Sequence, residues 1–279
     1  TSNALQPLFR QYSGAIVFTY GDTNTTLAAA MAAKRAGMVL HHFEGGIRTG
    51  DLSMPEEMNR IITDRLADVN YCCTALNYNT LKNEGYGAGI SGKTFLTGDL
   101  MFDAFLKTKP IIPHLNEKEY IACTIHRAAN IGNAKTLLAI VNALNYIHKQ
   151  IPVLVPLHPH TKKRLKDYDI QPKFNVLPPL GYKEMKGFLQ NSNSVITDSG
   201  GVSREAYFSS KKSLIISPVL FWPEIGLENC SLSALPQTDI IIERYNQLQV
   251  LSSNFSNHLF GKGNAAEKIH SIIQTDTGR

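Results

Sequence analysis

Short apolar segments alternate with longer helical segments along almost the whole chain. Residues 15–20, 38–43 and 120–124 are rich in β-branched, aromatic and other apolar side chains, which is typical of buried strands. The Ala-rich segment 25–36 and the segment 56–66 lie between them and have the composition of helices. Because a helix separates successive strands, we expect parallel sheets that are covered by helices on both faces.

The same alternation continues through the second half of the chain. It predicts strands at residues 153–156, 194–197 and 213–216, helices at 134–148, 183–190 and 202–208, and a last helix at 265–273. We therefore expect an α/β fold with doubly wound sheets.

A domain boundary is expected at residues 107–119, where Pro110 and Pro113 interrupt the alternation. The predicted parts are a first domain at residues 1–107, a second domain at 108–262, and a C-terminal helix at 263–279 that packs back on the first domain.

The first 13 residues predict a helix that leads into a strand. A Gly-rich strand–turn–helix unit often opens a nucleotide-binding sheet, and none precedes them. We therefore expect the first domain to be truncated at its N-terminus.

Composition and charge narrow the possible functions. With 279 residues, 43% of them apolar, the chain can bury a sizeable core in two lobes. Its formal net charge of +5 suits an anionic ligand. Nucleic acid is not expected as a partner, because no dense Lys/Arg segment is interleaved with aromatic residues. The basic group at residues 162–166 is interpreted as a solvated helix face.

The cysteines and the hydropathy predict a cytoplasmic protein. Cys72, Cys73, Cys123 and Cys230 have no metal-type pair spacing and are interpreted as reduced thiols. No segment has the uncharged apolar length of a membrane span, and no secretory signal is visible.

Polar clusters follow several predicted strands, at the sheet edge where open α/β folds bind ligands. The first is the turn Gly21-Asp22-Thr23. Helix capping explains one or two of its polar residues. It explains Asp22 less well, because this residue lies at the tip of the strand and points to the expected cleft.

The second cluster begins with Glu44, which follows a hydrophobic strand and precedes Gly45 and Gly46. The glycines permit a tight loop and the close approach of a ligand. Glu44 is therefore a candidate acid or base, and a salt bridge to Arg48 is its structural alternative.

The third cluster opens a helix with Pro55, Glu56 and Glu57. Proline in the first turn and acids near the positive helix end account for these residues structurally. Glu56 and Arg60 are four residues apart and share one face. If that face lines the cleft, Glu56 can transfer a proton while Arg60 holds it or the substrate.

The fourth cluster combines Ser199, Gly200 and Gly201 at the start of a helix with Glu205 one turn later. Two glycines at a helix N-terminus expose backbone N–H groups where the helix dipole is positive, which suits a diphosphate. A carboxylate at Glu205 can accept both hydroxyl hydrogens of a ribose. A simple helix cap would not require two glycines as well.

Histidines follow two further strands. His126 and Arg127 follow one, and His158 and His160 follow the next. Two such groups beside a phosphate-type loop favour a functional site. A metal site at His158 and His160 is the alternative, but it lacks a matching carboxylate or thiolate nearby in the sequence, so no metal is expected.

Five motifs occur in the order found in the non-hydrolysing UDP-N-acetylglucosamine (UDP-GlcNAc) 2-epimerases, and the chain resembles this family over residues 5–275. They are Gly-Asp-Thr (21–23), Glu-Gly-Gly-Ile-Arg (44–48), Pro-Glu-Glu-x-Asn-Arg (55–60), Thr-x-His-Arg (124–127) and Asp-Ser-Gly-Gly-x-x-x-Glu (198–205). The resemblance implies two Rossmann-like domains in a GT-B-like arrangement, with the active site between them, and a homodimer.

The resemblance also implies roles for individual residues. The implied catalytic residues are Asp22, Glu44, Glu56 and His126. The implied substrate-binding residues are Arg60, Arg127, His158, Ser199, Gly200, Gly201 and Glu205.

The implied reaction converts UDP-GlcNAc to UDP-N-acetylmannosamine, or epimerises a close UDP-sugar, for surface polysaccharide synthesis. A base removes the C2 proton while UDP leaves, and a 2-acetamidoglucal forms. UDP adds back after a proton returns on the other face, so no redox cofactor is expected.

The sequence departs from the family pattern in the second half. Many relatives have Arg-Asp and Thr-Glu or Thr-Thr-Glu before the equivalent of Trp222-Pro223-Glu224, whereas residues 217–221 are Ser-Pro-Val-Leu-Phe here. Ala129 replaces a Glu that often follows His-Arg. Alternative functions are an inactive or UDP-sugar-binding remnant, a GT-B glycosyltransferase and a hydrolysing epimerase, and the acidic cluster of the first lobe argues against the glycosyltransferase.

Overall fold

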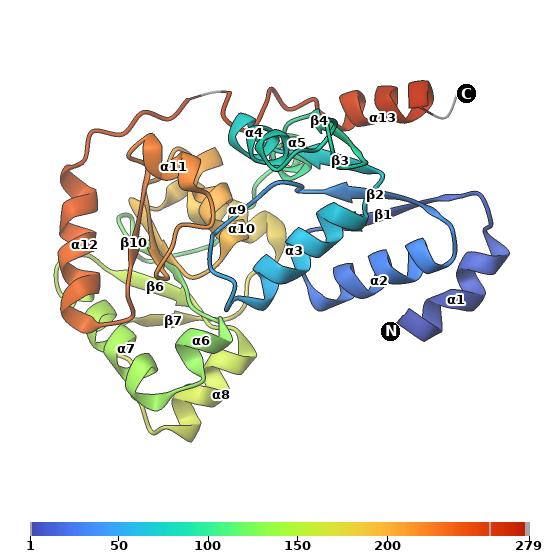
Figure 1. The fold of residues 1–279 in the computed structure, drawn as a ribbon. Helices are drawn as coiled ribbons and strands as arrows, with labels where there is room; N and C mark the ends of the chain where they lie inside the picture. The colour runs from blue at the N-terminus through green and yellow to red at the C-terminus, as the bar shows by residue number, and fades with distance from the viewer. Residues whose placement is uncertain (1, 257, 277–279) are drawn as a thin grey trace. The chain divides into compact units, whose positions relative to one another are not determined.

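The computed structural model describes residues 2–256 and 258–276, and the chain divides into two compact units (Figure 1). Unit 1 comprises Thr1–Leu106 with Asn257–Arg279, and unit 2 comprises Lys107–Ser256. Residues 1, 257 and 277–279 belong to the expected domain ranges but lie outside the described residues. Each unit is a parallel α/β structure, as the alternating apolar segments predict.

Unit 1 contains a parallel sheet in which the strands lie in chain order. The strands are β1 (Ile16–Tyr20), β2 (Val39–Phe43), β3 (Val69–Cys72) and β4 (Lys93–Leu96). The helices are α1 (Ser2–Gln11), α2 (Asn24–Arg35), α3 (Pro55–Leu66), α4 (Ala75–Asn83), α5 (Leu100–Lys107) and α13 (Ala265–Asp276).

Alternation along β2 directs successive side chains to opposite faces of this sheet. Leu40 packs with Phe9 of α1 and with alanines of α2, whereas Phe43 packs with Tyr71 of β3 and Ile269 of α13. The C-terminal helix thus belongs to unit 1. Asp103 of α5 caps it, because its carboxylate accepts hydrogen bonds from the backbone N–H groups of Ala265 (3.1 Å) and Ala266 (2.8 Å).

Unit 2 contains a six-stranded parallel sheet in the order β10-β9-β8-β5-β6-β7. The strands are β5 (Ile121–Thr124), β6 (Val153–Pro156), β7 (Asn175–Leu177), β8 (Ser194–Thr197), β9 (Ser213–Ile216) and β10 (Ser231–Ala234). The helices are α6 (Ala128–Ile131), α7 (Ala134–His148), α8 (Pro159–Asp167), α9 (Tyr182–Asn191), α10 (Gly200–Phe208), α11 (Pro223–Leu227) and α12 (Thr238–Val250).

The strand order of unit 2 reverses direction beside β5. The chain runs from β5 through β6 to β7 on one side, and then returns to β8 on the other. Connections that diverge in this way leave a crevice at the carboxyl ends of the two central strands. The residues that follow β5 and β8, among them His126 and Ser199, therefore lie at the switch point of the sheet.

Several elements were not expected from the sequence. The strands β3, β4, β7 and β10 are short, and polar residues such as Asn70, Lys93 and Asn175 interrupt their apolar character. Helix α10 begins at Gly200 rather than at residue 202, because Ser199 acts as its cap. Helix α13 extends to Asp276 rather than to residue 273.

All four cysteines are buried free thiols. Among residues 2–256 and 258–276, no helix combines the length and the apolar character that a membrane crossing requires.

Candidate active site

The turn that follows β1 holds Asp22 at the tip of the strand. Thr23, not Asp22, caps α2, because its hydroxyl oxygen accepts a hydrogen bond from the backbone N–H of Thr26 (3.2 Å). The carboxylate of Asp22 accepts a hydrogen bond from Nη2 of Arg60. Its backbone carbonyl accepts one from Nδ2 of Asn59 (2.9 Å). Helix α3 thus fixes both the backbone and the side chain of Asp22, and capping of α2 does not explain this acid.

Arg60 bridges two acids, Asp22 and Glu57. Its Nη1 donates to Glu57 Oε2 at 2.6 Å, and its Nη2 donates to Asp22. Glu57 is buried and also accepts from the backbone N–H groups of Thr49 and Gly50, each at 3.0 Å. Arg60 thus pairs with Glu57 rather than with Glu56, and its alternative role, contact with the substrate, stays a prediction. Positions three and four residues before an arginine both lie on its face, and here the buried one is its partner.

Glu44 directly follows β2 and has an unusual backbone conformation. Its φ of 68° lies in the left-handed region, which costs a residue with a side chain about 1–3 kcal/mol. Its Oε2 lies beside Gly21, 3.9 Å from the position that a Cβ would occupy there. Backbone strain of this kind gathers at functional sites, and here it directs a carboxylate to the Asp22 turn.

A cavity of about 310 Å³ opens beside Glu44 in unit 1. Tyr20, Phe43 and Tyr71 line it with aromatic surface, and Asp99 adds a second acid. A largely apolar cavity with few polar groups is typical of a small-molecule site. Glu44 therefore has space beside it for part of a ligand.

Arg48 is not the partner of Glu44. Its guanidinium donates to Asp64 Oδ2 at 2.7 Å and to Glu84 Oε1 at 2.8 Å. The salt bridge between Glu44 and Arg48, which was the structural alternative, is therefore wrong. Glu44 is not needed to neutralise Arg48, because two other acids do so.

The glycines after Glu44 are required by the packing of the protein itself. A Cβ on Gly46 would lie 2.2 Å from the backbone oxygen of Asn77, and its φ is 81°. A Cβ on Gly45 would lie 3.1 Å from Asn70 and 3.2 Å from Asp64. Crowding by Asn77 is therefore enough to explain the glycine at position 46, and the space at position 45 is also tight.

Gly46→Ala should destabilise the protein by about 2–4 kcal/mol, because overpacking adds to the strain of a positive φ. Gly50→Ala is the matched control. Its φ is 76° but nothing lies within 4 Å, so a loss of about 1 kcal/mol is expected. Chemical denaturation of both variants measures the difference, and equal losses would contradict the packing explanation.

In unit 2, Asp198 organises the residues that follow β5. It is fully buried, and its carboxylate accepts from the backbone N–H groups of His126 (3.0 Å) and Arg127 (2.8 Å) and from Nδ2 of Asn130 (3.1 Å). Its Oδ1 also lies 3.3 Å from Nδ1 of His126. A carboxylate with several N–H donors is a strong anchor, so Asp198 holds the two candidate residues at the tip of β5.

The two histidines of unit 2 lie side by side at the strand tips. The ring centroids of His126 and His158 are 6.1 Å apart, and both side chains are exposed. Nδ1 of His158 accepts a hydrogen bond from the backbone N–H of His160 (3.2 Å), so a neutral His158 carries its proton on Nε2. Nε2–H is then available as a donor to an anionic ligand.

Arg127 is held by an aromatic ring. Its guanidinium carbon lies 3.9 Å from the ring centroid of Phe221. The same ring packs on the start of α10, where a Cβ on Gly200 would be 3.5 Å from it. Phe221, in the segment that departs from the family pattern, therefore places a cation beside this helix start.

The start of α10 has the features of an anion site. Ser199 caps the helix, since its Oγ accepts from the backbone N–H of Val202 (3.3 Å). Among the described residues, no acceptor is bonded to the backbone N–H groups of Gly200 and Gly201. Both glycines are partly exposed. These N–H groups, at the positive end of the helix dipole, are able to bind a phosphate.

Glu205 lies one turn further along α10 and is buried. Burial raises the pKa of its carboxyl to about 7, although the positive charges of Arg204 and Lys186 act in the opposite direction. Carboxyl groups with a strongly shifted pKa are common at functional sites, so the raised pKa of Glu205 supports its place in the candidate site.

The raised pKa of Glu205 gives a pH-dependent stability. The folded state binds the proton up to about pH 7 and the unfolded state only to about pH 4.5, so stability falls as the pH rises through this interval. Glu205→Gln should therefore raise stability by about 1–3 kcal/mol at pH 8 and have no such effect below pH 4.5. Thermal unfolding across this range is the measurement. Glu119→Gln, at an exposed position of the same unit, should show no such trend.

Five residues of these groups were not among the candidate site residues. Asp64 and Asn130 were not named from the sequence, and Glu57, Asn59 and Asp198 stand in the motifs but were given no role. Their hydrogen-bond partners depend on how the chain packs, which the local sequence does not reveal. For Asp198, the position directly after a buried strand was a usable signal. Among the described residues, no group of three or more His, Cys, Asp or Glu side chains could hold a metal ion.

The two parallel α/β units have the fold of a nucleotide-sugar enzyme built from two Rossmann-like units of the GT-B-like class. Residues 2–274 match the profile of the family described as UDP-N-acetylglucosamine 2-epimerase, and the chain belongs to this family. The resemblance expected from the five motifs is thereby confirmed.

Similar proteins include an epimerase homolog and an epimerase whose names refer to different UDP-sugars. The chain is 32% identical over 275 residues to a UDP-N-acetylglucosamine 2-epimerase homolog of Methanococcus maripaludis, covering 93% of this chain and 75% of that protein. It is 36% identical over 259 residues to the UDP-2,3-diacetamido-2,3-dideoxy-D-glucuronate 2-epimerase of Pseudomonas aeruginosa, covering 91% and 73%.

Among solved structures, the fold is similar to that of Methanocaldococcus jannaschii UDP-GlcNAc 2-epimerase in complex with UDP-GlcNAc and UDP. The TM-score is 0.89 at 27% identity, and the match covers 98% of this chain and 79% of that chain. The expected fold class is confirmed by this match.

Proposed function

We propose that the protein epimerises C2 of UDP-GlcNAc, or of a close UDP-sugar, by elimination and re-addition of UDP. Membership of the epimerase family supports the reaction class. The feature that carries the proposal is the group at the strand tips of unit 1, where Glu44 lies beside Gly21, the residue before Asp22, and Arg60 holds Asp22.

The proposed chemistry needs a base and an acid and no change of oxidation state. When the base takes the C2 proton, the electron pair of the C–H bond forms a C1=C2 double bond, and the C1–O bond to UDP breaks. Return of a proton to the opposite face of C2 and of UDP to C1 completes the inversion. We assign the proton transfers to Asp22, Glu44 and Glu56, with His126 as a further catalytic group.

Unit 2 is proposed to bind the UDP. The backbone N–H groups of Gly200 and Gly201, together with Ser199, suit the diphosphate, and Glu205 suits the ribose hydroxyls. Arg127 and His158 supply donors near the leaving phosphate, where negative charge develops as the C1–O bond breaks. Arg60 of unit 1 is proposed to contact the sugar while it stays bonded to Asp22 and Glu57.

Product analysis tests this proposal. The purified chain is incubated with UDP-GlcNAc and, separately, with UDP-2,3-diacetamido-2,3-dideoxyglucuronate, and the products are followed by NMR. We expect a C2-epimerised UDP-sugar from one of them. Free N-acetylmannosamine would instead indicate a hydrolysing epimerase. Transfer to an added acceptor would indicate a glycosyltransferase, and UDP binding without turnover would indicate a binding remnant.

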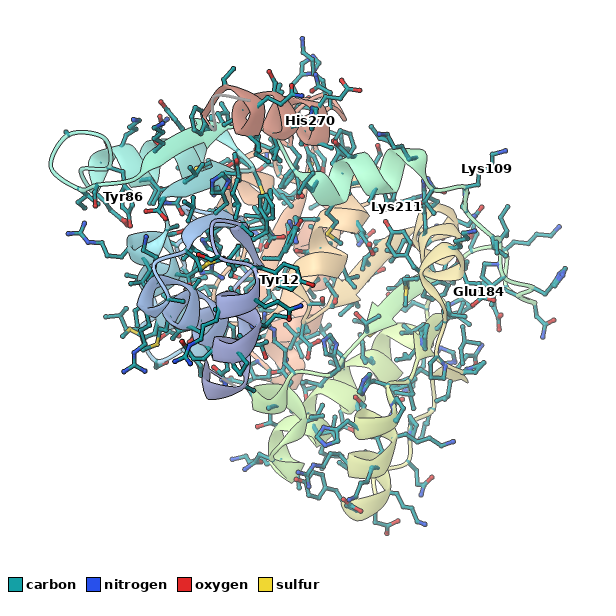
Figure 2. All side chains as sticks on the ribbon, turned by 90° about the vertical axis from the view of Figure 1, so that its right-hand side faces the viewer. Tyr12, Tyr86, Lys109, Glu184, Lys211 and His270 are labelled. Atoms are coloured by element: carbon teal, nitrogen blue, oxygen red, sulfur yellow. The ribbon has the colours of Figure 1, made fainter. Side chains whose placement is uncertain are left out.

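We also propose that the protein is a cytoplasmic homodimer that serves surface polysaccharide synthesis. The exposed apolar side chains of Leu8, Tyr12 and Met31 in and next to α1 and α2 support a protein contact on unit 1 (Tyr12 is labelled in Figure 2). Light scattering on the purified chain tests the dimer, and a monomer mass at micromolar concentration would contradict it.

A further inference from the structure

The imidazole of His42 lies between two hydrogen-bond acceptors. His42 belongs to β2, and its side chain is fully buried. Its Nδ1 lies 2.7 Å from Oδ1 of Asp64, and its Nε2 lies 2.9 Å from the backbone carbonyl oxygen of Gly21. Both ring nitrogens are therefore at hydrogen-bond distance from an oxygen.

Neither of these oxygens can donate a proton to the ring. Asp64 is held in its ionised form, because its Oδ2 accepts from Nη1 of Arg48 (2.7 Å) and from the backbone N–H of Gly46 (3.1 Å). The carbonyl oxygen of Gly21 has no hydrogen. Either neutral tautomer of His42 would therefore point a nitrogen lone pair at an acceptor inside the protein, which costs a buried hydrogen bond.

The charged groups around His42 also favour its cationic form. Asp64 of α3 and Glu44 at the end of β2 face it with negative charge, and Arg48 is shared between Asp64 and Glu84. Cys72 of β3 lies near Asp64 as a neutral thiol, since burial raises its pKa. Burial also acts to lower the pKa of His42, but the hydrogen bond and charge of Asp64 outweigh it, and the pKa lies above its usual value.

We propose that His42 is a permanently protonated imidazolium and a positioning residue. Its Nε2–H donates to the Gly21 carbonyl and so holds the turn that carries Asp22. Its positive charge also lies near the Glu44 carboxylate and stabilises the ionised form of that group. The charge and the hydrogen bonds follow from the contacts alone, whereas the catalytic consequence rests on the proposed function through Asp22 and Glu44.

This assignment completes a set of donors that fix one turn. Nε2 of His42 holds the Gly21 carbonyl, Nδ2 of Asn59 holds the Asp22 carbonyl, and Arg60 holds the Asp22 carboxylate. Because the imidazolium is bonded to α3 through Asp64, a change of its charge would disturb the position of Asp22 as well as the field at Glu44.

Nitrogen NMR of histidine-labelled protein tests the charge directly and needs no activity. We expect both ring nitrogens of His42 to show the protonated, imidazolium shifts from pH 6 to pH 9, in a signal that is missing in His42→Gln. A His42 signal that changes to a neutral tautomer within this range overturns the proposal.

The pH dependence of C2 proton exchange tests the consequence. In His42→Gln we expect kcat to fall about tenfold or more with a smaller change in KM, and the acid limb of the pH–rate profile to move to higher pH. His41→Gln is the matched control, because His41 is also buried but lies on the opposite face of β2, where its Nδ1 is 2.8 Å from the Tyr71 hydroxyl. It should leave the acid limb in place.

The two experiments separate this inference from the proposed function. An imidazolium at His42 in a protein that epimerises no UDP-sugar supports the charge assignment and contradicts the function. An active enzyme whose acid limb is unchanged in His42→Gln, or is shifted equally in His41→Gln, overturns the role of His42 and leaves the function intact.

Discussion

Glu44→Gln is expected to slow C2 proton exchange by about 10²–10⁴-fold, the usual contribution of a general acid or base. The amide keeps the size of the side chain but does not take up the C2 proton. Because the left-handed backbone at residue 44 is unchanged, the unfolding temperature should stay close to that of the original protein. Exchange of the C2 proton with solvent, followed by NMR, and thermal unfolding are the two measurements.

Glu44→Gly provides the matched control for strain. It should also lose exchange, but it relieves the positive φ and should raise stability by about 1 kcal/mol. An inactive variant that is more stable than the original would show that residue 44 is a glutamate for chemistry and not for folding. Exchange at the original rate in Glu44→Gln would remove Glu44 from the mechanism.

Asp198→Asn is expected to weaken UDP binding about 10- to 100-fold. The carboxylate now accepts from three N–H donors, and the amide nitrogen of asparagine would face at least one of them. That donor would lose its acceptor, at a cost of about 1–3 kcal/mol. His126 and Arg127 would then lose their fixed positions. Titration calorimetry with UDP measures the affinity.

Asp167→Asn is the control for Asp198. Asp167 is an exposed acid of unit 2, and it lies 3.9 Å from Arg164 at the end of α8. The Asp167→Asn variant should bind UDP with the affinity of the original protein, because an exposed ion pair contributes little to the stability of the fold. Unchanged UDP affinity in Asp198→Asn would mean that the strand tips of unit 2 do not depend on this carboxylate.

The arrangement of strands and polar clusters could be predicted because it depends on local sequence. Buried strands such as β5 and β8 are rich in apolar and β-branched residues, and the residues directly after them must lie at the carboxyl edge of the sheet. His126 and Ser199 are therefore placed by chain order alone. The alternation of strands and helices indicated these positions, and the family motifs then suggested a role for each residue.

The partners of these residues could not be predicted in the same way. Helical spacing allows Arg60 to meet either Glu56 or Glu57, and burial of Glu57 decides between them. The need for Gly46 arises from Asn77 of α4, which is 31 positions later in the chain. Nothing in the residue type of Glu44 indicates a positive φ, since such strain is maintained by the surrounding structure.

The most direct test of C2 epimerisation is deuterium incorporation from D2O. We expect the original protein, with UDP-GlcNAc or its close relative as substrate, to place deuterium at C2 of the epimerised UDP-sugar, and Glu44→Gln to place almost none. UDP binding without any deuterium at C2 in either sugar would contradict the proposed mechanism.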